Sequence, residues 1–196
     1  MRSEGKPNGF EKADYLKFLE QKQKAHILSG FDVEENGLNK FMFPFQKFIV
    51  KRALKAGKYA IFADCGLGKT LMQLEWANQV NKQTNKPVLI LAPLAVAGQT
   101  IKEGAKFNID ICKYDGSNAP IQISNYEQLE NIDCSLFSGI VLDESSILKN
   151  FEGATKKLIL DFFDKTPYKL ACTATDRKST RLNSSHVSES RMPSSA

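Results

Sequence analysis

ADCGLGKT, residues 63–70, decides the fold of this chain. The apolar run at residues 59–63 leads into it and predicts a short buried strand. The residues after it carry leucines at helical spacing, which predicts a helix over residues 70–81 with Leu71 and Leu74 facing inward. A strand that passes through a glycine-containing loop directly into a helix is a building unit of α/β proteins.

The glycines and the last two residues of this loop predict a site for phosphate groups. Gly66 and Gly68 allow backbone N–H groups to turn toward phosphate oxygens, and the helix that follows directs its positive end to the same point. Lys69 can reach the β and γ phosphates of a nucleotide, and the Thr70 hydroxyl can ligate Mg²⁺. The pattern is a relaxed one, because Ala63 stands in place of the first glycine. The alternative is a glycine-rich turn that contains Gly-Lys-Thr by chance.

Strands and helices alternate along the rest of the chain. Short apolar runs predict strands at residues 88–92, 109–114, 121–124, 139–143 and 168–172, and helical spacing predicts helices over residues 44–56 and 95–107. Apolar strands separated by helices indicate a mostly parallel sheet with helices on both faces. Ligands bind such sheets at the carboxyl ends of the strands, which is where the phosphate loop lies.

An acidic pair, Asp143-Glu144, ends the apolar strand predicted at residues 139–143. In enzymes with a phosphate loop, an acid at this place helps to hold Mg²⁺, and a neighbouring carboxylate can orient and deprotonate the attacking water. We therefore assign Asp143 to the metal and Glu144 to the water. The alternative is that the two carboxylates only cap the next helix.

The composition excludes several classes of protein. With 196 residues, 42% of them hydrophobic and 25% charged, the chain is expected to be a soluble globular domain, and its net charge of +5 permits an anionic partner without requiring one. No apolar run reaches the roughly 18 residues of a membrane span, and no apolar segment of a secretory signal follows the N-terminus. The four separated cysteines predict reduced thiols in a cytoplasmic protein rather than disulfides or a zinc site: Cys65, Cys112, Cys134 and Cys172. We further expect the cell to be bacterial or phage-infected.

The end of the chain, residues 176–196, differs in character from the rest. The run from Asp176 to His186 resembles a translated high-throughput sequencing adapter, and residues 190–196 match its continuation after a short variable index. We therefore expect the natural protein to be cut off at Thr175, with an artefact after it, and exclude residues 176–196 from the fold. The alternative is a serine-rich disordered tail. Without these residues 23 basic and 20 acidic side chains remain, a net charge of +3, and His26 is the only histidine, which argues against histidine-based catalysis.

The motifs between residues 41 and 175 resemble, in their order and spacing, the first motor domain of superfamily-two helicases and translocases. The Snf-type and phage-type branch of the DEAD/DEAH-box proteins is the most similar. The residues that carry the resemblance are 43–46 (the glutamine motif), 64–70 (motif I), 91–93 (Ia), 123–127 (Ib), 143–146 (II) and 173–175 (III). Motif II departs from the best-known members, because Ser145-Ser146 stands where they have Ala-Asp or Ala-His.

The resemblance implies a RecA-like P-loop NTPase domain that uses ATP and Mg²⁺. ATP would contact Gln46, which reads the adenine edge, and the motif I residues Asp64, Cys65, Gly66, Leu67, Gly68, Lys69 and Thr70. Thr70 and Asp143 would hold the metal, and Lys69, Asp143 and Glu144 would be catalytic. Pro93, Asn125 and Tyr126 would flank the nucleic-acid track. Thr173 and Thr175 would couple ATP hydrolysis to movement on the nucleic acid. A second motor domain, which carries arginine fingers in this family, lies outside the sequence.

Basic residues are concentrated between Asn36 and Ala63, where six of them and no acid occur. They are Lys40, Lys47, Lys51, Arg52, Lys55 and Lys58. They could contact the phosphates of a nucleic acid, or they could form a solvated helix face. The pattern alone does not distinguish DNA from RNA, whereas the Snf-type resemblance favours double-stranded DNA.

The sequence therefore predicts the ATP-binding motor domain of an ATP-dependent helicase or nucleic-acid translocase. Residues 1–40 are expected to form an N-terminal helix, over residues 11–28, and a loop. Residues 41–175 would form the motor domain, and residues 176–196 a non-native tail. Two alternatives remain open: an ATP-binding module without turnover, and a P-loop ATPase that acts on a protein partner.

Overall fold

The structure is a computed structural model, and it describes residues 28–149 and 153–174. The helix predicted over residues 11–28 lies outside this range except for Leu28. Thr175 and the adapter-like residues 176–196 also lie outside it.

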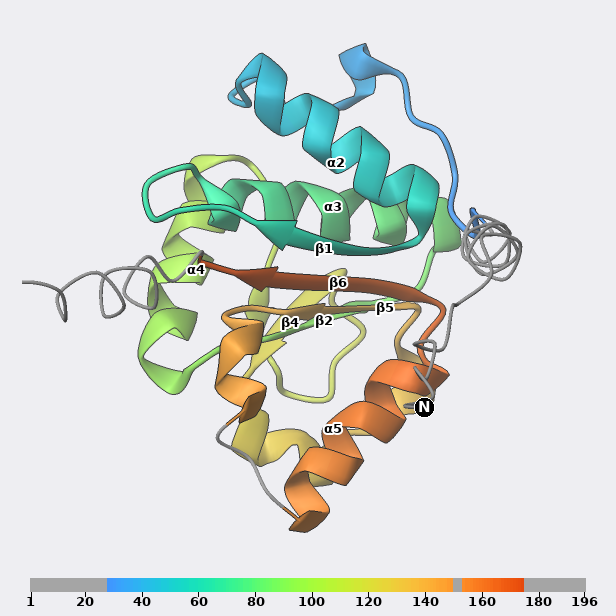
Figure 1. Cartoon of the computed structure of the whole chain (residues 1–196), viewed down its shortest axis with the longest axis vertical. Helices are drawn as coiled ribbons and strands as arrows, with labels where there is room; N and C mark the ends of the chain where they lie inside the picture. Colours follow the sequence, from blue (N-terminus) through green and yellow to red (C-terminus); the bar gives the residue numbers. More distant parts are fainter. Residues whose placement is uncertain (1–27, 150–152, 175–196) are drawn as a thin grey trace, which may run out of the picture.

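One six-stranded sheet forms the centre of the described chain (Figure 1). Its strands lie in the order β1-β6-β5-β2-β4-β3, and every pair is parallel, as the alternating pattern predicts. The bounds are Lys58–Phe62 (β1), Val88–Leu91 (β2), Cys112–Lys113 (β3), Ile121–Ser124 (β4), Gly139–Leu142 (β5) and Tyr168–Thr173 (β6). The strand predicted at residues 109–114 is shortened to the two residues of β3.

Helices cover both faces of the sheet. On one face lie α2 (Pro44–Ala56) and α3 (Lys69–Thr84), and on the other lies α5 (Gly153–Lys165), as Figure 1 shows. The helix α4 (Leu94–Lys106) contacts α3, and its Ala97 and Ile101 pack against the same apolar cluster as α3. Short 3₁₀ helices are η1 (Glu35–Gly37), η2 (Tyr126–Asn131), η3 (Cys134–Leu136) and η4 (Ser145–Lys149). Within the described ranges, no helix combines the length and the apolar character that a membrane crossing requires.

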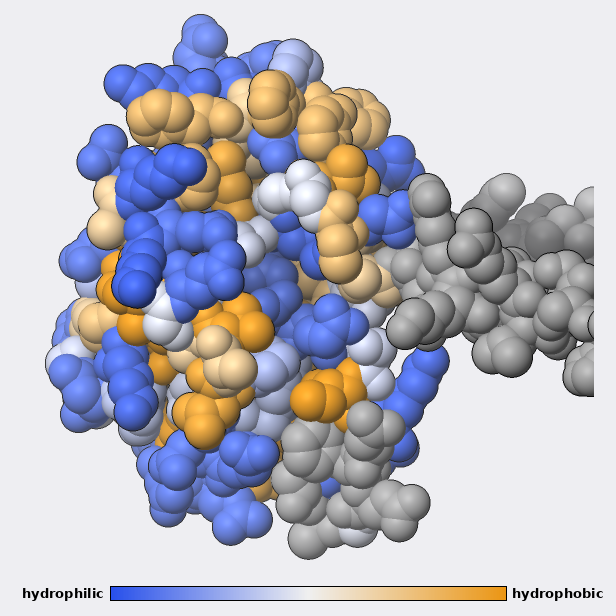
Figure 2. Space-filling model, turned by 90° about the vertical axis from the view of Figure 1, so that its left-hand side faces the viewer, coloured by the Kyte–Doolittle hydropathy of each residue, from blue (hydrophilic) through white to orange (hydrophobic). Residues whose placement is uncertain are grey.

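The first strand differs from its prediction. β1 is not buried, because it lies at the edge of the described sheet and pairs only with β6. The side chain of Phe62 at its carboxyl end is 71% exposed, and only Ile61 of this strand is buried. Figure 2 views the molecule from the side toward which the arrows of β1 and β6 point, and hydrophobic residues are visible on this surface.

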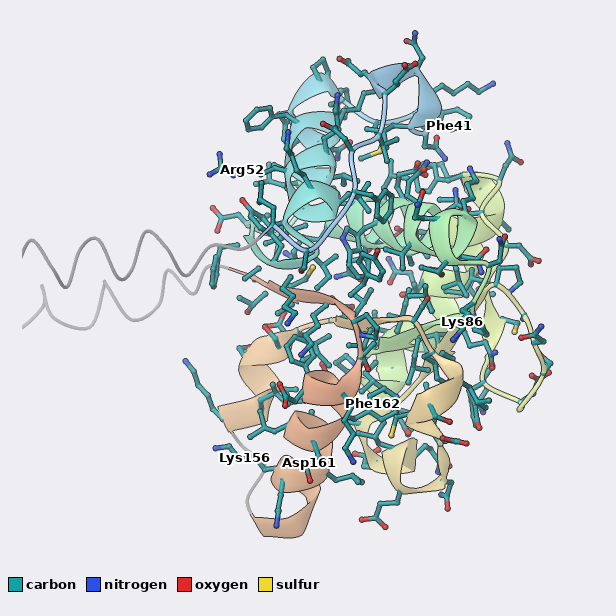
Figure 3. All side chains as sticks on the ribbon, turned by 90° about the vertical axis from the view of Figure 1, so that its right-hand side faces the viewer. Phe41, Arg52, Lys86, Lys156, Asp161 and Phe162 are labelled. Atoms are coloured by element: carbon teal, nitrogen blue, oxygen red, sulfur yellow. The ribbon has the colours of Figure 1, made fainter. Side chains whose placement is uncertain are left out.

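The helix α5 has no counterpart among the sequence predictions. Its buried residues Ile159 and Phe162 face the sheet, whereas Lys156 and Asp161 are exposed, and Figure 3 shows Phe162 on the inner side of the helix. Apolar residues three and four positions apart, beginning at Leu158, carry the helical period that would have identified it.

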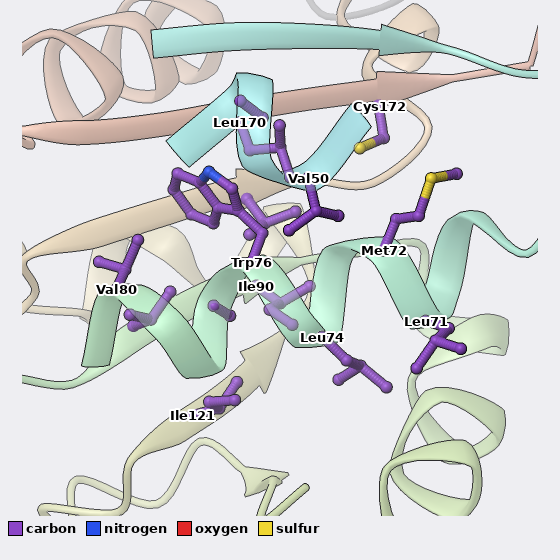
Figure 4. Packing of buried hydrophobic residues seen from close by; sticks show 14 of the residues in the cluster. Val50, Leu71, Met72, Leu74, Trp76, Val80, Ile90, Ile121, Leu170 and Cys172 are labelled. Atoms are coloured by element: carbon purple, nitrogen blue, oxygen red, sulfur yellow. The ribbon is translucent and has the colours of Figure 1, made fainter. Parts of the chain in front are cut away.

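Alternate residues of the central strands face the two layers. Leu89 and Leu91 of β2 belong to the apolar cluster beneath α5, whereas Ile90 belongs to the cluster beneath α2 and α3. In that second cluster the fully buried Trp76 of α3 packs with Val50 of α2 (Figure 4). The cluster beneath α2 and α3 fixes the sheet against α3, the helix that follows the phosphate loop, and the other cluster fixes the sheet against α5.

Candidate nucleotide-binding site

The phosphate loop connects the end of β1 to the first turn of α3. Gly66 and Gly68 have φ angles of +85° and +74°, a region that glycine enters without steric cost. A Cβ at Gly68 would lie less than 3.0 Å from the Gln46 side-chain nitrogen, so a larger residue there would have to displace the Gln46 amide. The 16-residue helix α3 begins at Lys69 and directs its positive end into the loop. The loop therefore has the backbone geometry predicted for a phosphate site.

The Lys69 side chain folds into the bend of the loop. Its Nζ donates hydrogen bonds to the carbonyl oxygens of Ala63, at 2.7 Å, and Asp64, at 3.3 Å. A phosphate oxygen bound in the bend would replace these carbonyls as the acceptor, and its negative charge makes it the stronger one.

Gln46 fastens the start of α2 to the phosphate loop. Its Oε1 accepts a hydrogen bond from the backbone N–H of Phe43, and its Nε2 donates one to the carbonyl of Leu67, both at 2.9 Å. The side chain is 4% exposed. Sequence reasoning assigns it only to the adenine edge, whereas the structure gives it a contact with the loop as well. Because each amide atom can make a second hydrogen bond, the contact with adenine stays a prediction.

A cavity of about 390 Å³ opens beside Gln46 and the two loop glycines. Three phenylalanines of the segment before and within α2 line it, and Phe107 closes it from the end of α4. The rings of Phe43 and Phe45 are stacked, with centroids 6.2 Å apart and an angle of 8° between their planes. Flat aromatic faces of this kind suit a planar heterocyclic base. Sequence reasoning missed these phenylalanines, although their density around the glutamine motif could have identified them.

The acidic pair lies directly opposite the first turns of α3. Gln73 of α3 donates a hydrogen bond from its Nε2 to Asp143 Oδ1 at 2.6 Å, and the backbone N–H of Glu144 donates to the same oxygen at 3.0 Å. Burial raises the pKa of the Asp143 carboxyl, whereas the Gln73 hydrogen bond and the charge of Lys69 act in the opposite direction. The hydrogen bond from Gln73 thus places the Asp143 carboxylate beside the helix that begins at Lys69, at one edge of the sheet.

Glu144 has an unusual backbone and two hydroxyl partners. Its φ angle is +51°, a region that residues other than glycine seldom adopt. Its Oε1 accepts hydrogen bonds from Thr173 Oγ1, at 3.1 Å, and from Ser146 Oγ. Thr173 at the end of β6 thus contacts the predicted water-activating carboxylate, and so does Ser146, one of the two residues at which motif II departs from its family pattern.

The oxygen atoms at this edge suit Mg²⁺. The Thr70 hydroxyl and the Asp143 carboxylate are hard oxygen donors, and Mg²⁺ is commonly held by one or two such groups together with phosphate oxygens and water. Among the described residues, no three His, Cys, Asp or Glu side chains group in a way that would hold an ion alone. The donor set therefore fits a metal that arrives with a nucleotide.

The three residues predicted to flank nucleic acid lie at the ends of two neighbouring strands. Pro93 precedes α4 after β2, and Asn125 precedes η2 after β4; both are partly exposed. Tyr126 differs from this expectation, because its side chain is only 2% exposed and its hydroxyl donates to the backbone carbonyl of Asp143 at 2.6 Å. A buried ring does not offer a surface contact to a strand.

The basic residues of α2 border a different cavity, of about 740 Å³. Lys47, Lys51 and Arg52 line it, and Lys55 forms an exposed ion pair with Asp32 at 3.3 Å. None of the phosphate-loop residues lines this cavity. The basic segment and the phosphate loop are therefore separate features of the surface.

Comparison with solved structures identifies the fold. No protein-family model matches the sequence, and no curated protein matches it. The SWI2/SNF2 ATPase core of Sulfolobus solfataricus in complex with dsDNA is similar with a TM-score of 0.62 and 22% identity, over 73% of this chain and 34% of that one. The UvsW helicase of bacteriophage T4 gives 0.60 and 16%, over 88% of this chain and 63% of that one. The chain has the RecA-like fold of helicase motor domains.

The Hef helicase domain of Pyrococcus furiosus has the same helicase-type fold, with a TM-score of 0.55 and 22% identity, over 67% of this chain and 33% of that one. The predicted α/β class and RecA-like architecture are thus confirmed. This chain spans about a third of the Sulfolobus and Pyrococcus structures and 63% of the T4 UvsW structure.

Proposed function

We propose that this chain is the ATP-binding motor domain of an ATP-dependent helicase or nucleic-acid translocase. ATP would bind with its triphosphate in residues 63–70 and its base in the phenylalanine-lined cavity beside Gln46. Hydrolysis of ATP would drive movement along DNA, with double-stranded DNA favoured by the Snf-type resemblance.

One observation carries the proposal. The hydrogen bond from Gln73 to Asp143 joins the helix of the phosphate loop to the acid at the end of β5, at 2.6 Å. The two motifs are about seventy residues apart in the chain, and a metal ion can serve both only if they meet at one edge of the sheet. A glycine-rich turn that only reversed the chain direction would need no acid beside it.

Each residue of the site then has a chemical task. The Lys69 ammonium would bind the phosphate tail, and the Thr70 hydroxyl and Asp143 carboxylate would hold Mg²⁺. When bound, the metal supplies positive charge that offsets the charge developing on the phosphate oxygens. The Glu144 carboxylate would accept a proton from the attacking water, and the Thr173 hydroxyl would keep that carboxylate in place.

Two partners complete the proposal. A nucleic-acid strand would pass the ends of β2 and β4 at Pro93 and Asn125, bound through its backbone rather than its bases. A second motor domain would supply the arginines that contribute about 10³–10⁵-fold to the rate in related phosphoryl-transfer systems. Without it, this chain is expected to bind ATP better than it hydrolyses it.

ATP binding tests the proposal. Lys69→Ala should weaken the affinity for Mg²⁺-ATP about 10- to 100-fold, because it removes charge-assisted hydrogen bonds to phosphate. Lys102→Ala, at an exposed position of α4, is the matched control and should leave the affinity unchanged. Equal affinities of wild type and Lys69→Ala would refute the site. ATP turnover of the full-length protein, measured with and without DNA, then separates an ATPase motor from an ATP-binding module.

A further inference from the structure

Tyr126 connects the end of β4 to the acidic pair at the end of β5, although these strands are not neighbours. β2 lies between them, so the two strands are about 10 Å apart, twice the spacing of adjacent strands. The tyrosine ring lies in the apolar cluster beneath α5, and its hydroxyl reaches the backbone carbonyl of Asp143.

The hydroxyl holds the peptide group between Asp143 and Glu144. The carbonyl of this peptide accepts from Tyr126 at 2.6 Å, and its N–H donates to Asp143 Oδ1 at 3.0 Å. The next residue, Glu144, has its φ angle of +51°, which persists only where the surroundings enforce it. Rotation of this peptide would relieve that angle and would move the Glu144 carboxylate away from Thr173. The Tyr126 hydroxyl therefore opposes a change that the backbone of Glu144 favours.

The ends of β2 and β4 are tied into the same network. The N–H of Ala92 donates to the carbonyl of Ser124 at 3.0 Å, and the N–H of Asp143 donates to the carbonyl of Leu91 at 2.8 Å. Pro93 and Asn125 follow these bonded residues directly. A displacement of Pro93 or Asn125 would therefore reach the backbone N–H of Asp143 through these hydrogen bonds. It would reach the peptide after Asp143 through the Tyr126 hydroxyl.

We propose that the Tyr126 hydroxyl couples the occupancy of the β2 and β4 ends by nucleic acid to the placement of Glu144. Tyr126 is a positioning residue in this scheme, because it acts through the Asp143–Glu144 peptide and contacts neither ligand. The inference rests on the proposed function, which supplies both ligands. Coupling of this kind is reciprocal, so it is measurable from binding alone: DNA changes the affinity for nucleotide by the same factor as nucleotide changes the affinity for DNA.

Tyr126→Phe removes only the hydroxyl and tests this coupling. The measurement is the Kd of a fluorescent, slowly hydrolysed ATP analogue with Mg²⁺, taken with and without a saturating short DNA duplex. DNA should change this Kd about tenfold in the wild type and about twofold or less in Tyr126→Phe. The affinity of Tyr126→Phe for each ligand alone should equal that of the wild type. Tyr114→Phe is the control, because Tyr114 packs against the same cluster with its ring 6.4 Å from Phe137. It should keep the wild-type ratio.

The outcomes separate this inference from the proposed function. A chain that binds neither nucleotide nor DNA refutes the proposed function and removes the basis of the coupling. If the chain binds both ligands, two results overturn the role of Tyr126 alone. One is a nucleotide Kd that DNA does not change in the wild type, and the other is a change of Kd in Tyr126→Phe that equals the wild-type change. If the variant does not fold, hydrogen exchange at the Glu144 amide of the wild type decides: DNA should change its rate, and an unchanged rate would overturn the proposal.

Discussion

The substitutions Gly66→Ala and Gly68→Ala together would separate two costs inside the phosphate loop. Both introduce backbone strain, but only Gly68→Ala also introduces a steric conflict. Gly66 and Gly68 both have positive φ angles, so alanine at either should cost about 1 kcal/mol of stability. A Cβ at Gly66 meets no atom within 4 Å, whereas one at Gly68 lies less than 3.0 Å from Gln46 Nε2. That amide is buried and bonded to Leu67, so displacing it costs about 1 kcal/mol more. We therefore expect a total loss of about 2 kcal/mol for Gly68→Ala.

Urea unfolding measures these differences. Trp76 is the only tryptophan of the chain and is fully buried, so its fluorescence reports the loss of the core. Gly98→Ala is the control, because Gly98 lies inside α4, has no positive φ, and would place a new methyl group with no atom within 4 Å. It should stabilise the protein by about 0.5–1 kcal/mol. If Gly68→Ala were as stable as Gly98→Ala, or no less stable than Gly66→Ala, the described loop geometry would be incorrect.

Three further predictions concern the buried interior and the link between α2 and the loop. Glu75 of α3 is 1% exposed, and burial raises its pKa. The ionised carboxylate is therefore more stable in the unfolded chain, and the free energy of unfolding falls as the pH rises above the unfolded pKa of about 4.3. Glu75→Gln should therefore gain stability relative to the wild type between about pH 4 and pH 7, and a difference that does not vary with pH would contradict this assignment. Phe162→Ala should lose about 3–5 kcal/mol in urea unfolding, whereas the exposed Lys156→Ala should change stability by less than about 0.5 kcal/mol; equal losses would show that α5 is not packed as described. Gln46→Ala should weaken ATP binding and also loosen the loop, visible as faster hydrogen exchange at residues 66–68; unchanged exchange would argue against its bond to Leu67.

The sequence predicts the sheet well because its strands and helices carry clear periods. β4, at residues 121–124, is predicted with its observed bounds, and the glycine-containing loop is found between the strand and helix that were expected. The strand at residues 59–63 is equally apolar, but apolarity alone does not tell an edge strand from a central one. Its exposure follows from the order of strands in the sheet, which only the structure provides.

The chemistry of the site is less accessible to sequence reasoning. Lys69 and Asp143 are found from motifs, because their spacing from neighbouring strands follows from the reaction they serve. Gln73 and Tyr126 are missed as partners of Asp143, since a glutamine within a helix and a tyrosine after a strand have no pattern that reveals a contact far along the chain. Such contacts arise when separate strand ends meet at one edge of the sheet.

The dependence of ATP affinity on Mg²⁺ tests most directly whether one metal ion links the phosphate loop to Asp143. In the wild type, the Kd for ATP should be about tenfold lower with Mg²⁺ than with a chelator, a difference of roughly 1.4 kcal/mol. Asp143→Asn should bind ATP as the wild type does in the chelator, yet gain almost nothing from Mg²⁺. An undiminished gain in Asp143→Asn would contradict the account.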